Sequence, residues 1–182
     1  RLHNSIGGTL NGEDIVYLCY HGLYYRFCTN QRPLLVEHIK SEITNYITPY
    51  VNVCFRVLEN ELKKRYDIET GSMKLVTGLY PNQVVVEIEK KFKMSRADKV
   101  REFNKFKMNL ANPIYNFAQI ANEIVNQEAQ YCHFNELGYM ILHPRFDISW
   151  TLTGDSDKIY VLKEREIGHE FKFVTKSCLL PP

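Results

Sequence analysis

An amphipathic stretch followed by a change of period limits the folds open to this chain. Between residues 36 and 62 the apolar side chains recur every three or four positions, which is the spacing of one face of an α-helix. Pro49 lies inside this stretch and should kink or break the helix near Thr48, because proline lacks an amide hydrogen and clashes with the preceding turn. The Gln-Arg-Pro at residues 31–33 marks the start. The sequence therefore predicts a long, kinked helix in its N-terminal half.

From Tyr66 onwards the apolar period falls to two residues, which is typical of β-strands. We expect strands at residues 67–70, 74–77, 83–91 and 100–110. Turns are expected at Gly71-Ser72 and at residues 80–82, a Tyr-Pro-Asn. The segment 100–110 also suits a helix, but its alternation of apolar and polar side chains favours a strand.

A second helix is predicted over residues 113–128, where Pro113 suits a first helical position. An aromatic hairpin precedes the long helix, with strands at 16–20 and 23–27 around His21-Gly22. A meander follows the second helix, with strands at 139–142, 146–153, 158–163 and 169–175 and a turn at 153–157.

The order of these elements predicts an α+β fold. We expect a mainly antiparallel sheet packed against the long N-terminal helix and the second, shorter helix. A chain of 182 residues suits one domain. The sequence therefore predicts a glycine-rich arm or edge strand at residues 1–12 and a single domain at 13–182.

The cysteines are spread from end to end and include no C-x-x-C motif, which argues against a redox motif or a zinc site. They are Cys19, Cys28, Cys54, Cys132 and Cys178. Cys19 and Cys28 could face each other across the predicted hairpin or its mouth. From five cysteines we expect two disulfides and one leftover thiol, in an oxidising compartment. The alternative is five reduced, buried thiols.

The first residue is Arg1, from which we expect a processed product that once followed a signal peptide or membrane anchor. No stretch of the chain approaches the roughly 20 apolar residues of a membrane-spanning helix. Contact with a membrane is therefore expected only through a segment absent from this chain.

The net charge of +2 is nearly balanced and predicts no nucleic-acid partner. Basic residues do cluster locally, at Lys90, Lys91, Lys93, Arg96, Lys99, Arg101, Lys105 and Lys107. A solvated strand pair or a lysine-protected sheet edge explains this cluster, and a ridge that binds polyanions is the alternative.

The sequence contains no motif that predicts catalysis. The chain contains neither G-x-S-x-G nor H-E-x-x-H. Cys132 and His133 are adjacent, so their side chains should point apart. Asp155 and Asp157 could bind Ca²⁺ weakly, although the same spacing is ordinary turn chemistry. We therefore expect no catalytic residues, no cofactor and no enzyme.

Interaction surfaces are better supported by the sequence. Aromatic residues concentrate in the first hairpin, at Tyr17, Tyr20, Tyr24, Tyr25 and Phe27. They indicate either a contact surface or ordinary packing on a sheet. The arm with Gly7 and Gly8 would add a strand to a neighbouring subunit or pair with its own sheet.

Several phrases in the sequence carry a resemblance. They are GLYY at residues 22–25, PNQVVVEIEKKFKM at 81–94, REFNKFKMNL at 101–110, PIYNFAQIANEIVNQE at 113–128 and KIYVLKEREIGHEFKFVTKSC at 158–178. Their order resembles uncharacterised exported, membrane-anchored surface proteins of small-genome (DPANN-type) archaea. The resemblance implies an extracellular or cell-surface location and supplies no activity and no catalytic residues.

We therefore expect an extracellular structural protein, a subunit of a cell surface, filament or coat, that associates with itself or with other surface proteins. The alternative is a surface binding module for a protein or glycan that uses the aromatic hairpin. A secreted hydrolase built on Cys132 and His133 ranks third.

Overall fold

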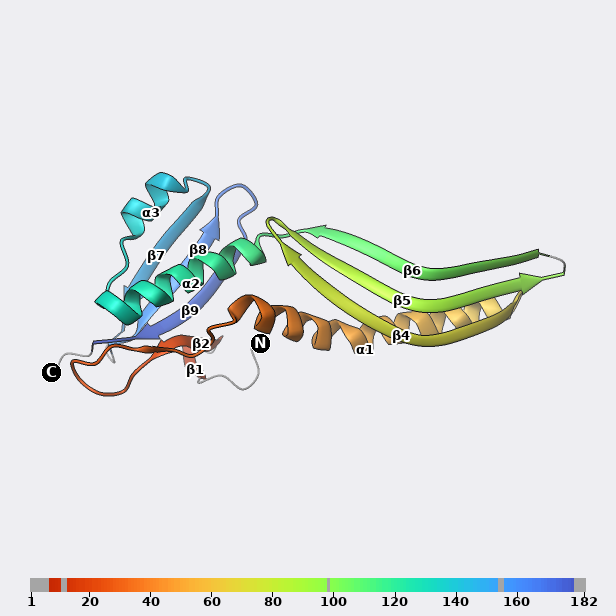
Figure 1. Ribbon diagram of the computed structural model, residues 1–182, viewed down its shortest axis with the longest axis horizontal. Helices are drawn as coiled ribbons and strands as arrows, with labels where there is room; N and C mark the ends of the chain where they lie inside the picture. The colour runs from red at the N-terminus through yellow and green to blue at the C-terminus, as the bar shows by residue number, and fades with distance from the viewer. Residues whose placement is uncertain (1–6, 11–12, 98, 154–155, 179–182) are drawn as a thin grey trace. The chain divides into compact units, whose positions relative to one another are not determined.

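The computed structural model describes residues 7–10, 13–97, 99–153 and 156–178 (Figure 1). The elements are β1 (Gly7–Leu10), β2 (Glu13–Tyr20), β3 (Thr29–Asn30), α1 (Leu35–Lys63), β4 (Asp67–Tyr80), β5 (Gln83–Arg96), β6 (Lys99–Ala111), α2 (Ile114–Tyr131), α3 (Glu136–Leu142), β7 (Phe146–Leu152), β8 (Lys158–Glu164) and β9 (Glu170–Lys176). The α+β prediction is confirmed.

The chain divides into two compact units. Unit 1 comprises residues 1–38 and 113–182, and unit 2 comprises residues 39–112. The sequence-based division at residue 12 marks neither boundary between these units. One boundary lies inside the first turns of α1 and the other directly before α2, and no linker composition marks either of them.

Unit 1 contains a mixed sheet with the strand order β1-β2-β9-β8-β7, and the short β3 also pairs with β2. The β2–β9 pair is parallel, whereas the β1–β2, β2–β3, β7–β8 and β8–β9 pairs are antiparallel. The strand pairing thus places the N-terminal part of unit 1 beside its last strand.

The core of unit 1 lies between this sheet and α2. The buried face of α2 comprises Phe117, Ala118, Ile120, Ala121, Ile124, Val125 and Glu128, which follow the helical period. Stacked rings continue the core onto the sheet, with Phe117 against Phe171 and Tyr160 against Phe173. Burying each large apolar side chain contributes about 2 kcal/mol, so this face holds α2 in place.

Two predicted strands of unit 1 are wrong. Residues 23–27 form a loop, and β3 pairs with β2 in their place. Tyr25 has a φ of 56°, which is incompatible with a strand. Residues 139–142 belong to α3, because the Asn135 side chain accepts a hydrogen bond from Gly138 N at 3.0 Å and caps a helix there.

Unit 2 contains an antiparallel sheet with the order β4-β5-β6. The turn at Pro81-Asn82 and the strand at 100–110 are confirmed, and Asn82 takes the left-handed conformation with φ 60°. The turn predicted at Gly71-Ser72 is wrong. A register shift between Thr70 and Met73 accommodates these residues as a bulge within β4.

Helix α1 runs without interruption through Pro49, so the helix does not break there, and the kink expected near Thr48 stays a prediction. In unit 2 the helix covers one face of the sheet: Phe55 packs on Phe106 with ring centroids 5.3 Å apart, and Glu59 pairs with Lys90 at 3.2 Å. The opposite face carries the cross-strand pairs Glu87–Lys107 and Glu89–Lys105, at 3.0 and 3.2 Å.

The basic cluster thus belongs largely to the β5–β6 pair, where carboxylates of β5 face lysines of β6. This arrangement fits the expected solvated strand pair. Not all of the apolar side chains that recur along α1 face the sheet, in contrast: Tyr46, Tyr50, Val53 and Val57 are exposed. The inward positions here belong to the neighbouring line through Phe55.

Candidate functional site

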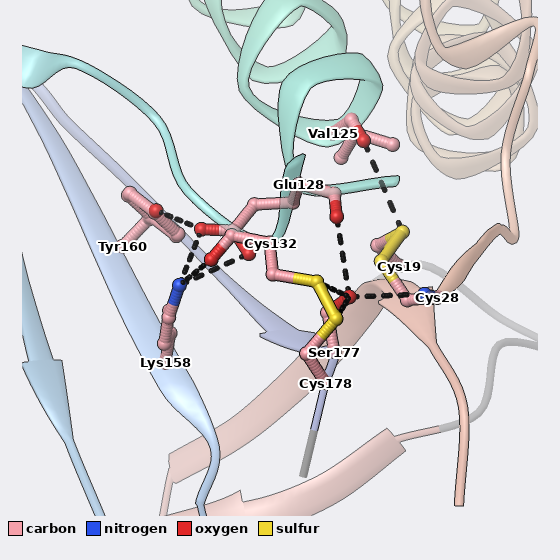
Figure 2. Close-up of polar contacts among 9 residues, drawn as sticks. All are labelled: Cys19, Cys28, Val125, Glu128, Cys132, Lys158, Tyr160, Ser177 and Cys178. Atoms are coloured by element: carbon pink, nitrogen blue, oxygen red, sulfur yellow. Dashed lines mark hydrogen bonds and ion pairs between the residues drawn. A yellow bond between two sulfur atoms is a disulfide. The ribbon is translucent and has the colours of Figure 1, made fainter. Parts of the chain in front are cut away.

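The last full turn of α2 places a buried carboxylate against β8 (Figure 2). Lys158 Nζ donates to Glu128 Oε1 at 2.8 Å and to Oε2 at 3.1 Å, and the Tyr160 hydroxyl donates to Oε1 at 2.6 Å. Lys158 Nζ also donates to the Cys132 carbonyl at 2.6 Å. We call Glu128, Lys158 and Tyr160 the carboxylate cluster.

The cluster compensates the charge that it buries. A buried carboxylate without partners is strongly destabilising, and here the ammonium of Lys158 supplies both opposite charge and hydrogen bonds. Burial, together with the charge of Glu128 and its hydrogen bond, raises the pKa of Tyr160 above its ordinary value. Tyr160 therefore remains a proton donor to Glu128 at neutral pH, and the Lys158 ammonium uses all three of its hydrogens on protein oxygens. This arrangement suits rigid fixation of α2 on the sheet.

Two disulfides lie in the described part of unit 1. Cys19–Cys28 joins β2 to the residue before β3, and Cys132–Cys178 joins the end of α2 to the segment after β9, with Cα atoms 5.3 and 5.9 Å apart. Cys54 is an exposed free thiol on α1. The predicted two disulfides and one free thiol are therefore confirmed.

Disulfide bonding changes the candidate chemistry. Cys132 has no thiolate while it is bonded to Cys178, so the Cys132-His133 pair of the hydrolase hypothesis lacks a nucleophile in this state. For the same reason Cys19 offers no thiolate as a metal ligand while it is bonded to Cys28.

Ser177 connects the end of α2 to the first disulfide (Figure 2). Its hydroxyl donates to the Glu128 carbonyl at 3.2 Å and accepts from the Cys28 amide at 3.0 Å. Sequence reasoning missed the roles of Ser177 and Lys158. It did contain a signal for Glu128, since a carboxylate on the apolar line of a helix requires a buried partner.

The loop at residues 21–27, which we call the aromatic loop, leaves the end of β2 (Figure 1). It displays Leu23, Tyr24, Tyr25 and Phe27, with 64, 54, 68 and 55% of their surfaces exposed. Monomeric proteins seldom gather so many large apolar side chains on one short exposed segment. This loop is the strongest candidate contact surface of unit 1.

The predicted aromatic interaction residues are thus divided by the structure. Tyr24, Tyr25 and Phe27 come together in the loop, whereas Tyr17 and Tyr20 lie half-buried on β2 with their rings 5.3 Å apart. Tyr17 has a structural role, because its hydroxyl donates a hydrogen bond to Asp157 Oδ2 at 2.6 Å.

The aromatic loop is tied down at both ends. His21 N donates to the Lys176 carbonyl at 2.9 Å, and the Arg26 carbonyl accepts from Cys178 N at 2.8 Å. Within the loop, Leu23 N donates to His21 Nδ1 at 3.0 Å. The Cys19–Cys28 disulfide also links the two ends of the loop, so the backbone that carries the exposed side chains is restrained.

The remaining candidates have structural roles. Asp157 pairs with Lys176 at 3.1 Å as well as with Tyr17, which leaves its carboxylate poorly placed for a cation, and Asp155 lies outside the described residues. The described residues include no group of three or more His, Cys, Asp or Glu side chains suited to a metal ion. Gly7 and Gly8 pair with Val16 and Ile15 of the chain's own β2.

Comparison of the chain with models of protein families, with curated proteins and with solved structures gives no match. Function is therefore inferred from the chain's own contacts, burial and charge. The two disulfides are consistent with an oxidising environment. Among the described helices, none has the length and apolarity needed to cross a bilayer.

Proposed function

We propose that the protein is a non-enzymatic structural protein of the cell surface or extracellular space, and that it assembles with further copies of itself through unit 2. One observation carries this proposal: α1 is apolar on a second, exposed side. We call Tyr46, Tyr50, Val53 and Val57 the outer stripe of α1.

The outer stripe has the geometry of a helix-packing surface. Its members are spaced four, three and four residues apart, so they lie on one side of the helix. Tyr46 and Tyr50 are 69 and 59% exposed, and their rings contact each other with centroids 5.3 Å apart. A helix of a solitary domain normally turns charged residues to solvent, so this stripe favours a partner helix.

Strand β6 adds exposed apolar surface to the same unit. Phe103, Met108 and Leu110 are all at least 44% exposed, and β6 pairs with β5 alone among the described strands. The lysines along β6 discourage unlimited pairing at this edge, because adding a strand there would crowd their charges. A second copy is therefore expected to dock chiefly on α1.

The extracytosolic location rests on the disulfides. Cytosolic thiols are normally kept reduced, whereas exported proteins retain disulfide bonds. The resemblance to exported archaeal surface proteins points to the same location and stays a prediction.

The assembly proposal is tested with Tyr50→Ser, Val53→Ser and Val57→Ser combined. These positions are exposed, so the variant should keep its fold while self-association, measured by sedimentation velocity, weakens about tenfold or more. Electron microscopy of the wild-type protein at high concentration should show assemblies that the variant lacks.

The matched control replaces Leu137 and Ile141 by serine. Both are exposed apolar residues of α3 in unit 1, so this variant should assemble like the wild type. A wild-type chain that stays monomeric at high concentration would contradict the proposal, as would equal loss in both variants.

The alternative function is a surface binding module for a protein or glycan, and the aromatic loop is the observation that favours it. A glycan array would detect it: one specific ligand without self-association would support this alternative over assembly. A hydrolase function would need residues other than the disulfide-bonded Cys132.

A further inference from the structure

The aromatic loop of unit 1 combines three properties that point to one kind of ligand. They are exposed apolar side chains, positive charge and a backbone restrained by hydrogen bonds and a disulfide. We propose that this loop docks the protein onto the surface of a lipid bilayer that contains anionic headgroups. The inference is independent of assembly through α1, because it concerns different residues in the other unit.

The side chains of the loop match the interface of a bilayer. Leu23 and Phe27 are wholly apolar and suit the acyl boundary, while Tyr24 and Tyr25 each combine an apolar ring with a hydroxyl. Aromatic rings with a polar tip are enriched at headgroup level, where the ring contacts acyl chains and the polar tip contacts water. All four side chains are more than half exposed.

The charge of the segment complements an anionic surface. From Tyr20 to Leu34 the chain carries Arg26 and Arg32 and no carboxylate, and Arg26 is exposed between Tyr25 and Phe27. Asp157, an acidic residue bonded to β2 and β9 in this unit, is paired with Lys176 at 3.1 Å. Basic side chains near a bilayer are attracted by anionic lipids, and their long stems keep the charge among the headgroups.

Part of the backbone of the loop already has hydrogen-bond partners within the protein. The His21 and Leu23 amides donate hydrogen bonds within the protein, and the Arg26 carbonyl accepts one. Polar backbone groups that already have partners lose less on leaving water. The Cys19–Cys28 disulfide also limits the conformational freedom that binding would otherwise remove.

The size of the loop favours a bilayer over a globular partner. A stable protein–protein interface uses about 20–30 residues and about 800 Å² from each side. The aromatic loop comprises only residues 21–27. A bilayer requires no shape complementarity, since its lipids rearrange around the inserted side chains.

The test uses the whole chain and vesicles of two compositions. One set is phosphatidylcholine alone, and in the other about a third of the lipid is phosphatidylglycerol. Flotation should recover the protein with the mixed vesicles at least about fivefold more than with neutral ones, and the difference should shrink as salt screens the charges.

Three variants locate the binding surface. Leu23→Ser with Phe27→Ser should weaken partitioning into mixed vesicles about tenfold, whereas Arg26→Gln should remove most of the preference for anionic lipid. Leu137→Ser with Ile141→Ser removes two apolar residues of α3 that are more exposed than Leu23 and Phe27, and should leave binding unchanged. A tryptophan in place of Leu23, in a chain that also carries Trp150→Phe and so has a single tryptophan, should shift its emission to the blue only when mixed vesicles are added.

Specific outcomes would overturn the proposal. They are absence of binding to either vesicle set, equal loss in the α3 control, and an unshifted emission from the tryptophan variant. Dimers that form without lipid and disappear in the loop variant would assign the loop to a second copy. The outer-stripe variant separates the two proposals: it should lose assembly and keep vesicle binding, measured at a concentration where the wild type is monomeric.

Discussion

At the scale of single residues, Glu128 shows how one charge defines a packing arrangement. It lies on the apolar face of α2, has no exposed surface and meets Lys158 and Tyr160 of β8. A buried ion pair adds little net stability compared with apolar side chains, but removing one member leaves the other charged and unpaired. The carboxylate cluster therefore favours one position of α2 on the sheet, because other positions would leave a buried charge without its partner.

We predict that Glu128→Gln destabilises the protein by about 3 kcal/mol, because the Lys158 ammonium would lose its counter-charge in a mostly buried site. The side chain of Lys158 is only 17% exposed, so solvent compensates little. Urea-induced unfolding monitored by circular dichroism measures the change.

Glu123→Gln is the matched control. Glu123 lies on the exposed side of the same helix and accepts a hydrogen bond from Gln127. Its replacement should change the unfolding free energy by about 0.5 kcal/mol or less. Similar effects of the two substitutions would refute the role assigned to the cluster.

At the scale of elements, the turn between β8 and β9 depends on a second carboxylate. Glu164 accepts from Arg145 Nε at 2.8 Å and from Ile167 N at 3.1 Å. Its backbone N–H donates to the His169 carbonyl at 2.9 Å. Gly168, at φ 76°, supplies the left-handed residue of this turn. Glu164 thus links the residue before β7 to the end of β8 and the start of β9.

This carboxylate predicts a specific pH dependence. The hydrogen bond from Arg145 lowers the pKa of Glu164 below its ordinary 4.5; burial opposes the shift and the Ile167 amide adds to it. Because the folded state holds this proton less tightly than the unfolded state, the stabilisation is complete above the ordinary pKa. It is lost as the pH falls through the lowered folded pKa.

We therefore expect the difference in unfolding free energy between the wild type and Glu164→Gln to be largest near neutral pH and to shrink below about pH 4.5. Urea titrations across the acidic range measure it. Glu166→Gln, an exposed neighbour in the same turn, should differ little from the wild type throughout. A Glu164→Gln difference independent of pH would show that the ion pair contributes nothing.

At the scale of the whole molecule, disulfides close loops of very different length. Cys19 and Cys28 are 9 residues apart in sequence, whereas Cys132 and Cys178 are 46 apart. The longer loop restricts the unfolded chain more, so the second bond should stabilise the protein more than the first. The Cys132–Cys178 disulfide, which closes the longer loop, also joins α2 to the end of the sheet. The Cys19–Cys28 disulfide acts locally on the aromatic loop.

We predict that replacing Cys19 and Cys28 by alanine costs about 3 kcal/mol and that replacing Cys132 and Cys178 costs about 4 kcal/mol, from loop-closure entropy. Chemical unfolding under non-reducing conditions measures both. Cys54→Ala should be nearly neutral, because Cys54 is an exposed free thiol. A larger effect from the shorter loop would contradict this account.

Long periodic segments were predictable from local sequence. Helices α1 and α2 and strands β5 and β8 were all expected, because each repeats its apolar period over several turns or residues. The pairing of Cys19 with Cys28 could also be predicted from the sequence, since the two cysteines are close in the chain. Short segments failed: one side-chain cap at Asn135 outweighed the alternation that predicted a strand at residues 139–142.

The amino-acid sequence by itself determined the α+β class, the long helices and the presence of enough cysteine for two disulfides, because these depend on local periodicity and composition. Only the tertiary structure decided which face of α1 meets its sheet, since two neighbouring apolar lines look alike in sequence. It also decided that Glu128 meets Lys158 and that β2 lies parallel to β9. These contacts join distant parts of the chain, and their free energy comes from burial that no local pattern encodes.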